Sequence, residues 1–167
     1  MSNTVQKKIL VSACLLGQCV RYKGDSCPQD ILLNPDISAY LVPFCPECAG
    51  GLPTPRPPAE ICGSNGGSGV WQSKAKVINN AATDITEAYK KGALLCLETM
   101  QKQNICTAIL KQRSPSCGTK AIYDGSFSGT KIAGLGVTAA LLAANGCKLY
   151  SEEELTPELL RQLLSNK

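Results

Sequence analysis

The stretch KILVSAC, residues 8–14, decides the fold because it is an apolar run rich in β-branched residues that ends in a cysteine. A short, continuous apolar run of this kind is typical of a strand buried on both faces of a parallel sheet. Three later segments have the same character: YLVPFC (40–45), CTAILKQR (106–113) and CKLYSE (147–152). The sequence therefore predicts four buried strands.

Helices are predicted between and after these strands. The clearest covers 84–103, where apolar residues recur at helical spacing and give one face to the core. A second covers VTAALLAA (137–144), and a third covers TPELLRQLLSN (156–166), with Thr156 as N-cap and Pro157 in the first turn. We also expect a short helix within 29–39. Glycine and proline predict irregular loops at 50–58, 63–69 and 114–131, with a hairpin or extended excursion at 70–80.

Strands that alternate with helices favour a parallel sheet covered on both faces. We therefore predict an α/β fold: a single three-layer, Rossmann-like domain over residues 1–167, with a mainly parallel sheet and helices on both faces. Ligands of such sheets bind beyond the carboxyl ends of the strands. This rule directs attention to the residues that follow each predicted strand.

The composition limits the classes of ligand and the cellular location that we expect. The chain has 167 residues, ten cysteines, no histidine and a net charge of +4. This charge is too small to favour duplex nucleic acid, although it suits a small anionic ligand. The apolar run 9–13 is shorter than the roughly 7–15 residues of a secretion signal, so we expect a cytoplasmic protein with reduced thiols and no membrane segment.

Three cysteines follow three different strands. Cys14 ends the first, Cys45 ends the second, and Cys117 lies four residues after Arg113. We expect these thiols to meet at the carboxyl edge of the sheet, where they would hold either a zinc ion with an open position or an iron–sulfur cluster with one iron that lacks a protein ligand. An open iron would be free to act as a Lewis acid on a substrate.

CPEC (45–48) also has the spacing of a redox dithiol or of half a structural zinc site. A redox dithiol draws on a helix N-terminus, and the glycines and prolines after Cys48 argue against a helix there. A structural zinc site needs a second pair of ligands, for which there is no second C-x-x-C and no histidine. Cys96, Cys106, Cys147 and Cys62 are expected to pack as small apolar residues, whereas Cys19 and Cys27 lie near the expected site.

Several motifs together resemble the thiouracil desulfidase family, and the resemblance covers nearly the whole chain in order. The segments that carry it are SACLLG (12–17), VRY-x-G (20–24), VPFCPE (42–47), GGLPTPRPPAEI (50–61), D-x-TEA (84–88), AILKQRSPSCG (108–118), IYDGSFSGT (122–130) and GVTAALLAANG (136–146).

The resemblance implies a 4Fe–4S cluster held by Cys14, Cys45 and Cys117, with one iron lacking a protein ligand. That iron would bind the sulfur of a small thiolated base or nucleoside, such as 4-thiouracil, 2-thiouracil or a thiouridine, which is converted to the oxo form with release of sulfide and no net electron transfer. Glu47 and Ser114 would be the catalytic pair. Cluster-assembly machinery is implied as a partner.

Cys48 departs from the family pattern, which usually has an apolar residue there. If Cys48 bound the open iron, the chain would be a redox or sensing module, and a nucleotide-binding domain with packed cysteines is a third possibility. An anionic cluster beside Glu47 would raise the pKa of its carboxyl group by like-charge repulsion, which suits proton transfer near neutral pH. The alternative is that Glu47 caps a turn or pairs with Arg56. Arg56, Lys111 and Arg113 are the candidates to hold substrate.

Overall fold

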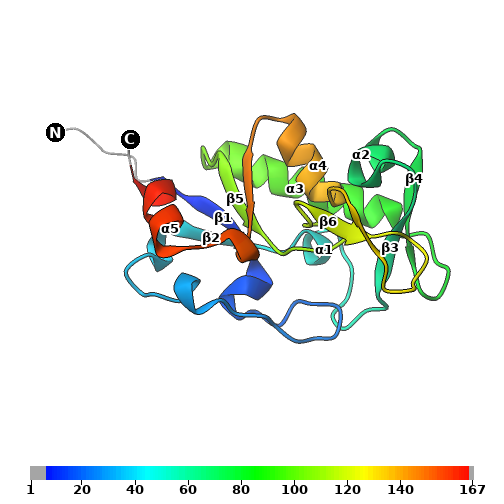
Figure 1. Cartoon of the computed structure of the whole chain (residues 1–167), viewed down its shortest axis with the longest axis horizontal. Coiled ribbons are helices and arrows are strands. Elements are labelled where there is room, and N and C mark those ends of the chain that lie inside the picture. Colours follow the sequence, from blue (N-terminus) through cyan, green and yellow to red (C-terminus); the bar gives the residue numbers. More distant parts are fainter. Residues whose placement is uncertain (1–6, 166–167) are drawn as a thin grey trace.

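The segment KILVSAC forms the predicted strand in a computed structural model that describes residues 7–165. Strand β1 (Ile9–Ser12) is fully enclosed and pairs in parallel with β2 (Leu41–Phe44) and β5 (Thr107–Leu110). β8 (Lys148–Ser151) pairs in parallel with β5, which gives the order β2-β1-β5-β8 (Figure 1). All four predicted strands are confirmed, as is the α/β class with a parallel sheet.

The sheet is the middle of three layers because both of its faces are apolar. Leu10 and Leu110 point to one face, where they pack with residues of α3 (Thr86–Lys102) and α4 (Val137–Ala144). Ile9 and Val11 point to the other face, where α5 (Pro157–Leu164) and the short 3-10 helices cover them. Each fully buried leucine or isoleucine contributes roughly 1.5–3 kcal/mol to stability. The 3-10 helices are Ala13–Leu16, Asp30–Leu32, Ser38–Tyr40 and Glu152–Glu154.

Helix α3 follows its predicted face closely. Tyr89, Gly92, Cys96 and Met100 recur at helical spacing and all are buried. The helix begins where expected because the Asp84 carboxylate accepts the backbone N–H of Thr86 at 3.0 Å. The terminal helix also begins as predicted, with the Thr156 hydroxyl accepting the backbone N–H of Leu159. Asn166 of that prediction lies outside the described residues, as do residues 1–6 of the predicted domain.

The structure differs from the predictions in two helical segments. The short helix expected within 29–39 is present as the 3-10 helix Asp30–Leu32, with a second 3-10 helix at Ser38–Tyr40, and the glycine-rich segment 63–69, which was expected to be a loop, is largely helix because α2 spans Gly66–Trp71. The glycines of α2 allow other backbone segments to approach the helix closely; they do not make the segment flexible. A Cβ on Gly67 would lie 2.2 Å from the carbonyl oxygen of Gly136, and one on Gly69 would lie 1.7 Å from that of Ser64.

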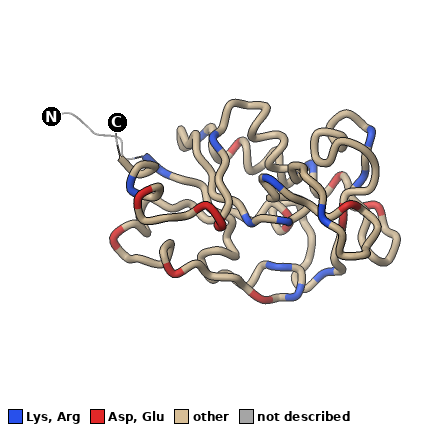
Figure 2. The backbone as a smooth tube through the Cα atoms, in the orientation of Figure 1, with Lys and Arg blue, Asp and Glu red and all other residues tan. Residues whose placement is uncertain are grey.

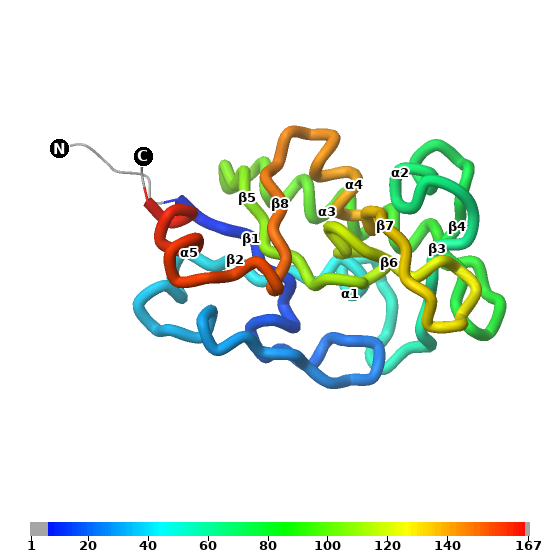
Figure 3. Tube along the Cα trace, in the orientation of Figure 1, coloured from blue at the N-terminus to red at the C-terminus, as the bar shows by residue number. Residues whose placement is uncertain are grey.

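Two small antiparallel pairs extend the molecule beyond the main sheet (Figure 3). β3 (Ala59–Gly63) pairs with β4 (Ala75–Asn79), so the extended segment expected at 70–80 is present from Ala75 on, whereas Val70 and Trp71 end α2. β6 (Ala121–Tyr123) pairs with β7 (Lys131–Ala133) inside the segment 114–131 that was expected to be an irregular loop. This second pair brings the IYDGSFSGT segment close to β3.

The ten cysteines all carry free thiols. Cys96 is fully buried as predicted, and Cys62 and Cys147 are partly buried, but Cys106 is exposed and does not pack as a core residue. The reason is that β5 begins one residue later, at Thr107, so Cys106 lies outside the strand. Among residues 7–165, no helix is both long enough and apolar enough to cross a membrane.

Candidate metal centre

A cavity of about 450 Å³ lies at the carboxyl ends of β1, β2 and β5. Its size is typical of sites for small ligands. Its walls come from segments far apart in sequence: the end of β1, the start of α1 (Pro46–Ala49), the segment 56–60, the loop 111–117 and the β6–β7 connection. Cys14, Cys45 and Cys117 all line it. The three thiols that the sequence placed at this edge are therefore brought together.

Cys14 lies in the 3-10 helix that follows β1 and is 7 % exposed. Burial raises the pKa of its thiol, and the neighbouring Cys27 and Cys117 add to this, while Lys111 opposes it. Cys27 donates its backbone N–H to the Cys14 carbonyl at 3.0 Å. Cys27 is thus a direct neighbour of Cys14, although it does not line the cavity.

Cys45 is the N-cap of α1, so the expectation that no helix is available at CPEC is wrong, although the helix has only four residues and ends at Ala49. Pro46 suits the first turn of a helix, and Gly92 of α3 leaves room for it: a Cβ there would lie 1.8 Å from the Pro46 carbonyl oxygen. A redox dithiol is disfavoured for a different reason. Burial raises the pKa of Cys45 to about 12, although the Cys48 backbone N–H opposes this, and thiol exchange needs a thiolate.

Cys48 is near Cys45 but is not part of the cavity wall. Its Sγ contacts the Thr54 hydroxyl at 3.5 Å. The second cysteine of CPEC therefore lies against the proline-rich segment rather than beside Cys14 and Cys117.

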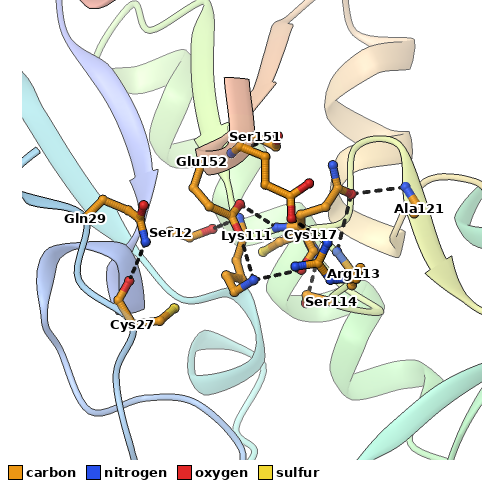
Figure 4. Close-up of polar contacts among 12 residues, drawn as sticks. Ser12, Cys27, Gln29, Lys111, Arg113, Ser114, Cys117, Ala121, Ser151 and Glu152 are labelled. Atoms are coloured by element: carbon orange, nitrogen blue, oxygen red, sulfur yellow. Dashed lines mark hydrogen bonds and ion pairs between the residues drawn. The ribbon is translucent and has the colours of Figure 1, made fainter. Parts of the chain in front are cut away.

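Cys117 lies in the loop after β5 and is surrounded by hydroxyl groups (Figure 4). Burial raises the pKa of its thiol to about 11, and hydrogen bonds from the side chains of Ser12, Ser116 and Ser114 oppose this. The Ser114 Oγ also accepts the backbone N–H groups of Ser116 and Cys117, both at 3.1 Å. Ser114 therefore shapes the turn that presents Cys117, and it lines the cavity as well.

The shape of this loop depends on a residue that sequence reasoning missed. Gln112 is 3 % exposed, and its amide oxygen accepts the backbone N–H groups of Arg113, Thr119, Lys120 and Ala121 at 3.0–3.3 Å. Figure 4 draws the bond to Ala121. One side chain thus ties both ends of the Cys117 loop together. The only signal in the sequence was an amide that directly follows a buried strand, which by itself identifies no partner.

Glu47 lines the cavity and also forms the ion pair that was its alternative role. The Arg56 Nη2 lies 2.6 Å and its Nε 2.7 Å from Glu47 Oε2. Arg56 is itself held in place, because its Nη2 donates to the Val20 carbonyl and its Nη1 to that of Pro53. Buried Tyr89 is a further hydrogen-bond partner of Glu47, and burial followed by the charge of Glu47 raises the pKa of Tyr89. Glu47 is therefore fixed in one orientation at the cavity.

The other two predicted substrate contacts, Lys111 and Arg113, line the cavity as well. Lys111 Nζ lies 2.6 Å from Glu152 Oε1, and Arg113 pairs with Glu153. Figure 4 shows the contact between Lys111 and Glu152. Arg56, Lys111 and Arg113 therefore already face carboxylates, as does Arg21, the fourth cation of the cavity wall, which pairs with Asp25. Figure 2 shows basic and acidic residues interspersed over the described part of the chain.

The donor set at the cavity fits an iron–sulfur cluster. It offers three sulfur ligands from three segments, hydroxyl groups directed at one of the sulfurs, and Lys111 close enough to Cys14 to favour its thiolate. Hydrogen bonds to cluster sulfurs and nearby charge are the means by which proteins tune such clusters. Within residues 7–165, no three His, Cys, Asp or Glu side chains are grouped as ligands of a single metal ion. In a cluster each iron takes its own thiolate, so its ligands need not surround one atom.

Comparison with known proteins gives three matches. The model of the 2-thiouracil desulfurase family matches residues 9–154. An uncharacterized protein of Bacillus subtilis (strain 168), YbbK, is 44 % identical over 147 residues, which cover 88 % of this chain and 97 % of that protein. A solved structure described as the [4Fe-4S]-dependent thiouracil desulfidase TudS is 43 % identical, covers 95 % of this chain and 98 % of its own, and superposes with a TM-score of 0.80.

Proposed function

Because the chain belongs to the 2-thiouracil desulfurase family, we propose that it is an enzyme that replaces the sulfur of a thiolated uracil with oxygen, using a 4Fe–4S cluster. The observation that carries this proposal is the meeting of Cys14, Cys45 and Cys117 with Glu47 and Ser114 in one cavity. Family membership supports this activity over a redox module or a nucleotide-binding domain with packed cysteines.

Cys14, Cys45 and Cys117 are the residues that would hold the cluster. Three ligands would leave one iron of a four-iron cluster without a protein ligand, and the position of Cys48 against Thr54 supports its role as a bystander. When bound, such a cluster supplies a Lewis-acidic iron that favours a soft sulfur donor over a carbonyl oxygen. Loading of the cluster implies assembly machinery as a partner.

Glu47 is proposed to accept a proton from the attacking water. Both contacts from Arg56 end on Oε2 of Glu47, so the guanidinium holds the carboxylate in a fixed orientation at the cavity. The ion pair and the catalytic role are therefore compatible. In this account Arg56 acts on substrate only through Glu47.

Ser114 is proposed to steady the substrate. Its oxygen accepts two backbone N–H groups, which fixes the position of the hydroxyl and leaves its hydrogen as the group that it donates. The hydroxyl also lies close enough to Cys117 to oppose the rise in the pKa of that thiol. It is the donor that would turn to the pyrimidine when substrate enters.

The expected substrate is an uncharged thiopyrimidine or its nucleoside. Each candidate cation at the cavity is balanced by a carboxylate: Arg56 by Glu47, Lys111 by Glu152 and Arg113 by Glu153. A phosphate would have to displace one of these partners. Lys111 and Arg113 remain candidates to donate hydrogen bonds to a neutral base.

The proposed reaction balances without electrons. One water and one thiocarbonyl give one carbonyl and one hydrogen sulfide, because the C–S bond breaks, a C–O bond forms and the two protons of water leave with the sulfur. Neither an oxidant nor a reductant is required.

An anaerobic assay tests the proposal. Reconstituted protein is incubated with 4-thiouracil, 2-thiouracil or a thiouridine in ¹⁸O-labelled water without reductant, and the same protein without iron serves as the control. We expect labelled uracil or uridine and an equal amount of sulfide. A strict need for stoichiometric reductant would contradict the hydrolytic step, and no turnover with any thiopyrimidine would contradict the activity.

A further inference from the structure

The connection between β6 and β7 carries one of the sequence motifs and borders the cavity, but it has no part in the proposed reaction. Tyr123, Phe127 and Gly129 line the same cavity as the three thiols. The connection is closed by its own polar groups: Asp124 donates its N–H to the Thr130 carbonyl at 3.0 Å, and the Asp124 carboxylate accepts both the N–H and the hydroxyl of Ser126. It is therefore an ordered turn with Phe127 near its tip.

A carboxylate from another motif holds this turn against the cavity. Glu60 of β3 is 8 % exposed, and its Oε1 accepts the backbone N–H groups of Gly125 at 3.0 Å and Phe127 at 3.2 Å. Gly125 allows the close approach, since it has a φ of +91° and a Cβ there would lie 2.6 Å from the Ile61 carbonyl oxygen. Figure 3 shows this yellow segment beside β3. Because one buried carboxylate oxygen accepts both N–H groups, Glu60 fixes the position of the Phe127 backbone.

Phe127 has two properties that a purely structural role leaves unexplained. It is 41 % exposed, although it is one of only two phenylalanines in the chain. Its φ is +56°, a conformation that is unfavourable for a bulky side chain and that is found where the surrounding structure imposes it. An aromatic ring held at the wall of a cavity, with apolar area still open to solvent, is suited to cover the face of a flat ligand.

We propose that Phe127 stacks on the ring of the thiopyrimidine and that Glu60 is a positioning residue that holds Phe127 at the cavity through the backbone of the turn. The ligand class is an uncharged planar heterocycle. This inference rests on the proposed function for the identity of that heterocycle, but stacking itself is a binding property and is measurable without turnover.

The test measures both turnover and binding of 4-thiouracil, the latter by calorimetry. Loss of a base-stacking aromatic weakens binding by about 5- to 100-fold. For Phe127→Ala we expect KM and Kd to rise by that factor, with kcat and iron content nearly unchanged, and Phe127→Tyr should restore both constants. Ile132→Ala is the matched control, because Ile132 is 45 % exposed on the same hairpin but does not line the cavity.

Glu60 is tested by a pair of variants. Glu60→Gln keeps an oxygen that accepts the same two N–H groups, so Kd should stay close to that of the wild type. Glu60→Ala removes the acceptor and should raise KM and Kd in the same direction as Phe127→Ala. If Glu60→Ala and Glu60→Gln have the same Kd as the wild type, Glu60 is not a positioning residue.

An unchanged Kd and KM in Phe127→Ala would overturn the stacking proposal. A wild type that binds 4-thiouracil but never converts it would overturn the proposed function instead, and the Kd of Phe127→Ala would still decide the stacking question. A shift in Ile132→Ala as large as that in Phe127→Ala would also overturn the proposal, because it would assign the effect to the hairpin as a whole.

Discussion

Cysteines lie beyond both ends of the four-stranded sheet, but their burial and their neighbours differ between the two ends. At the carboxyl end, Cys14, Cys45 and Cys117 line one cavity; Cys14 and Cys117 are buried, Cys45 is partly buried, and hydroxyl groups surround Cys117. At the amino end, Cys106 and Cys147 precede β5 and β8, whose register pairs Thr107 with Lys148. These two thiols are therefore neighbours as well, but Cys106 is exposed and neither residue lines the cavity.

The difference shows that neighbouring thiols alone do not make a metal site. At the carboxyl end the connections after three parallel strands turn inward and enclose polar groups together with the sulfurs. At the amino end the chain enters the strands directly: the Lys148 backbone N–H donates to the Cys106 carbonyl at 2.9 Å, which simply extends the ladder between β5 and β8. The position of a cysteine relative to the strand direction is thus more informative than the number of cysteines.

The largest expected effect separates the two ends outright. Cys117→Ala removes one of three proposed cluster ligands, and we expect loss of bound iron and of all measurable turnover. Cys147→Ala, the matched change at the amino end, should keep both. Iron and acid-labile sulfide analysis of the two anaerobically purified variants checks this. Equal iron content in both would mean that the carboxyl end does not hold the cluster.

A second variant removes chemistry at the carboxyl end without removing a ligand. Glu47→Gln retains the shape of the side chain and its contact with Arg56 but eliminates the proton acceptor. We expect turnover to fall by roughly 10²–10⁴, the usual range for a lost acid–base group, with an unchanged iron content. Steady-state rates with iron analysis on the same sample measure this. Full activity of this variant would contradict the catalytic role, and pairing with Arg56 would then be the only role of Glu47.

A third variant tests whether the Cys117 loop is held by Gln112. Gln112→Ala leaves four backbone N–H groups without their acceptor, and we expect unfolding to become easier by about 1–3 kcal/mol. Urea denaturation of the iron-free protein isolates this effect from cluster loss. Gln112→Glu keeps an acceptor oxygen and should recover most of the stability. Wild-type stability in Gln112→Ala would show that water replaces the amide at no cost.

The smallest effect is expected at the amino end. Cys106 is exposed and outside the strand, so Cys106→Ser should change the free energy of unfolding by no more than about 0.5 kcal/mol and leave turnover intact. Urea denaturation and the desulfuration assay measure the two quantities. A clear loss of iron in this variant would contradict the contrast between the two ends.

The sequence was most informative where apolar runs dictate structure. KILVSAC and its three counterparts predicted the sheet, and strand direction then predicted that Cys14, Cys45 and Cys117 meet. Reasoning failed where glycine serves close packing instead of flexibility, as in α2, and where a strand pair is only three residues long, as in β6 and β7.

The polar side of the site was also harder to foresee. The ion pairs of Lys111 with Glu152 and of Arg113 with Glu153 join residues about 40 positions apart, and four N–H groups converge on Gln112. Such contacts depend on how distant loops fold against each other. No local pattern in the sequence encodes them, whereas the apolar periodicity of a strand or helix is local.

The central claim is that the three thiols at the carboxyl end hold a four-iron cluster and leave one iron for substrate. Mössbauer spectra of ⁵⁷Fe-reconstituted protein, recorded without and with 4-thiouracil, test it most directly. We predict about four irons per chain, of which one changes its spectrum when 4-thiouracil is added and none changes with uracil. Four irons that do not respond to 4-thiouracil would contradict the claim, because they would indicate a cluster closed by a fourth protein ligand.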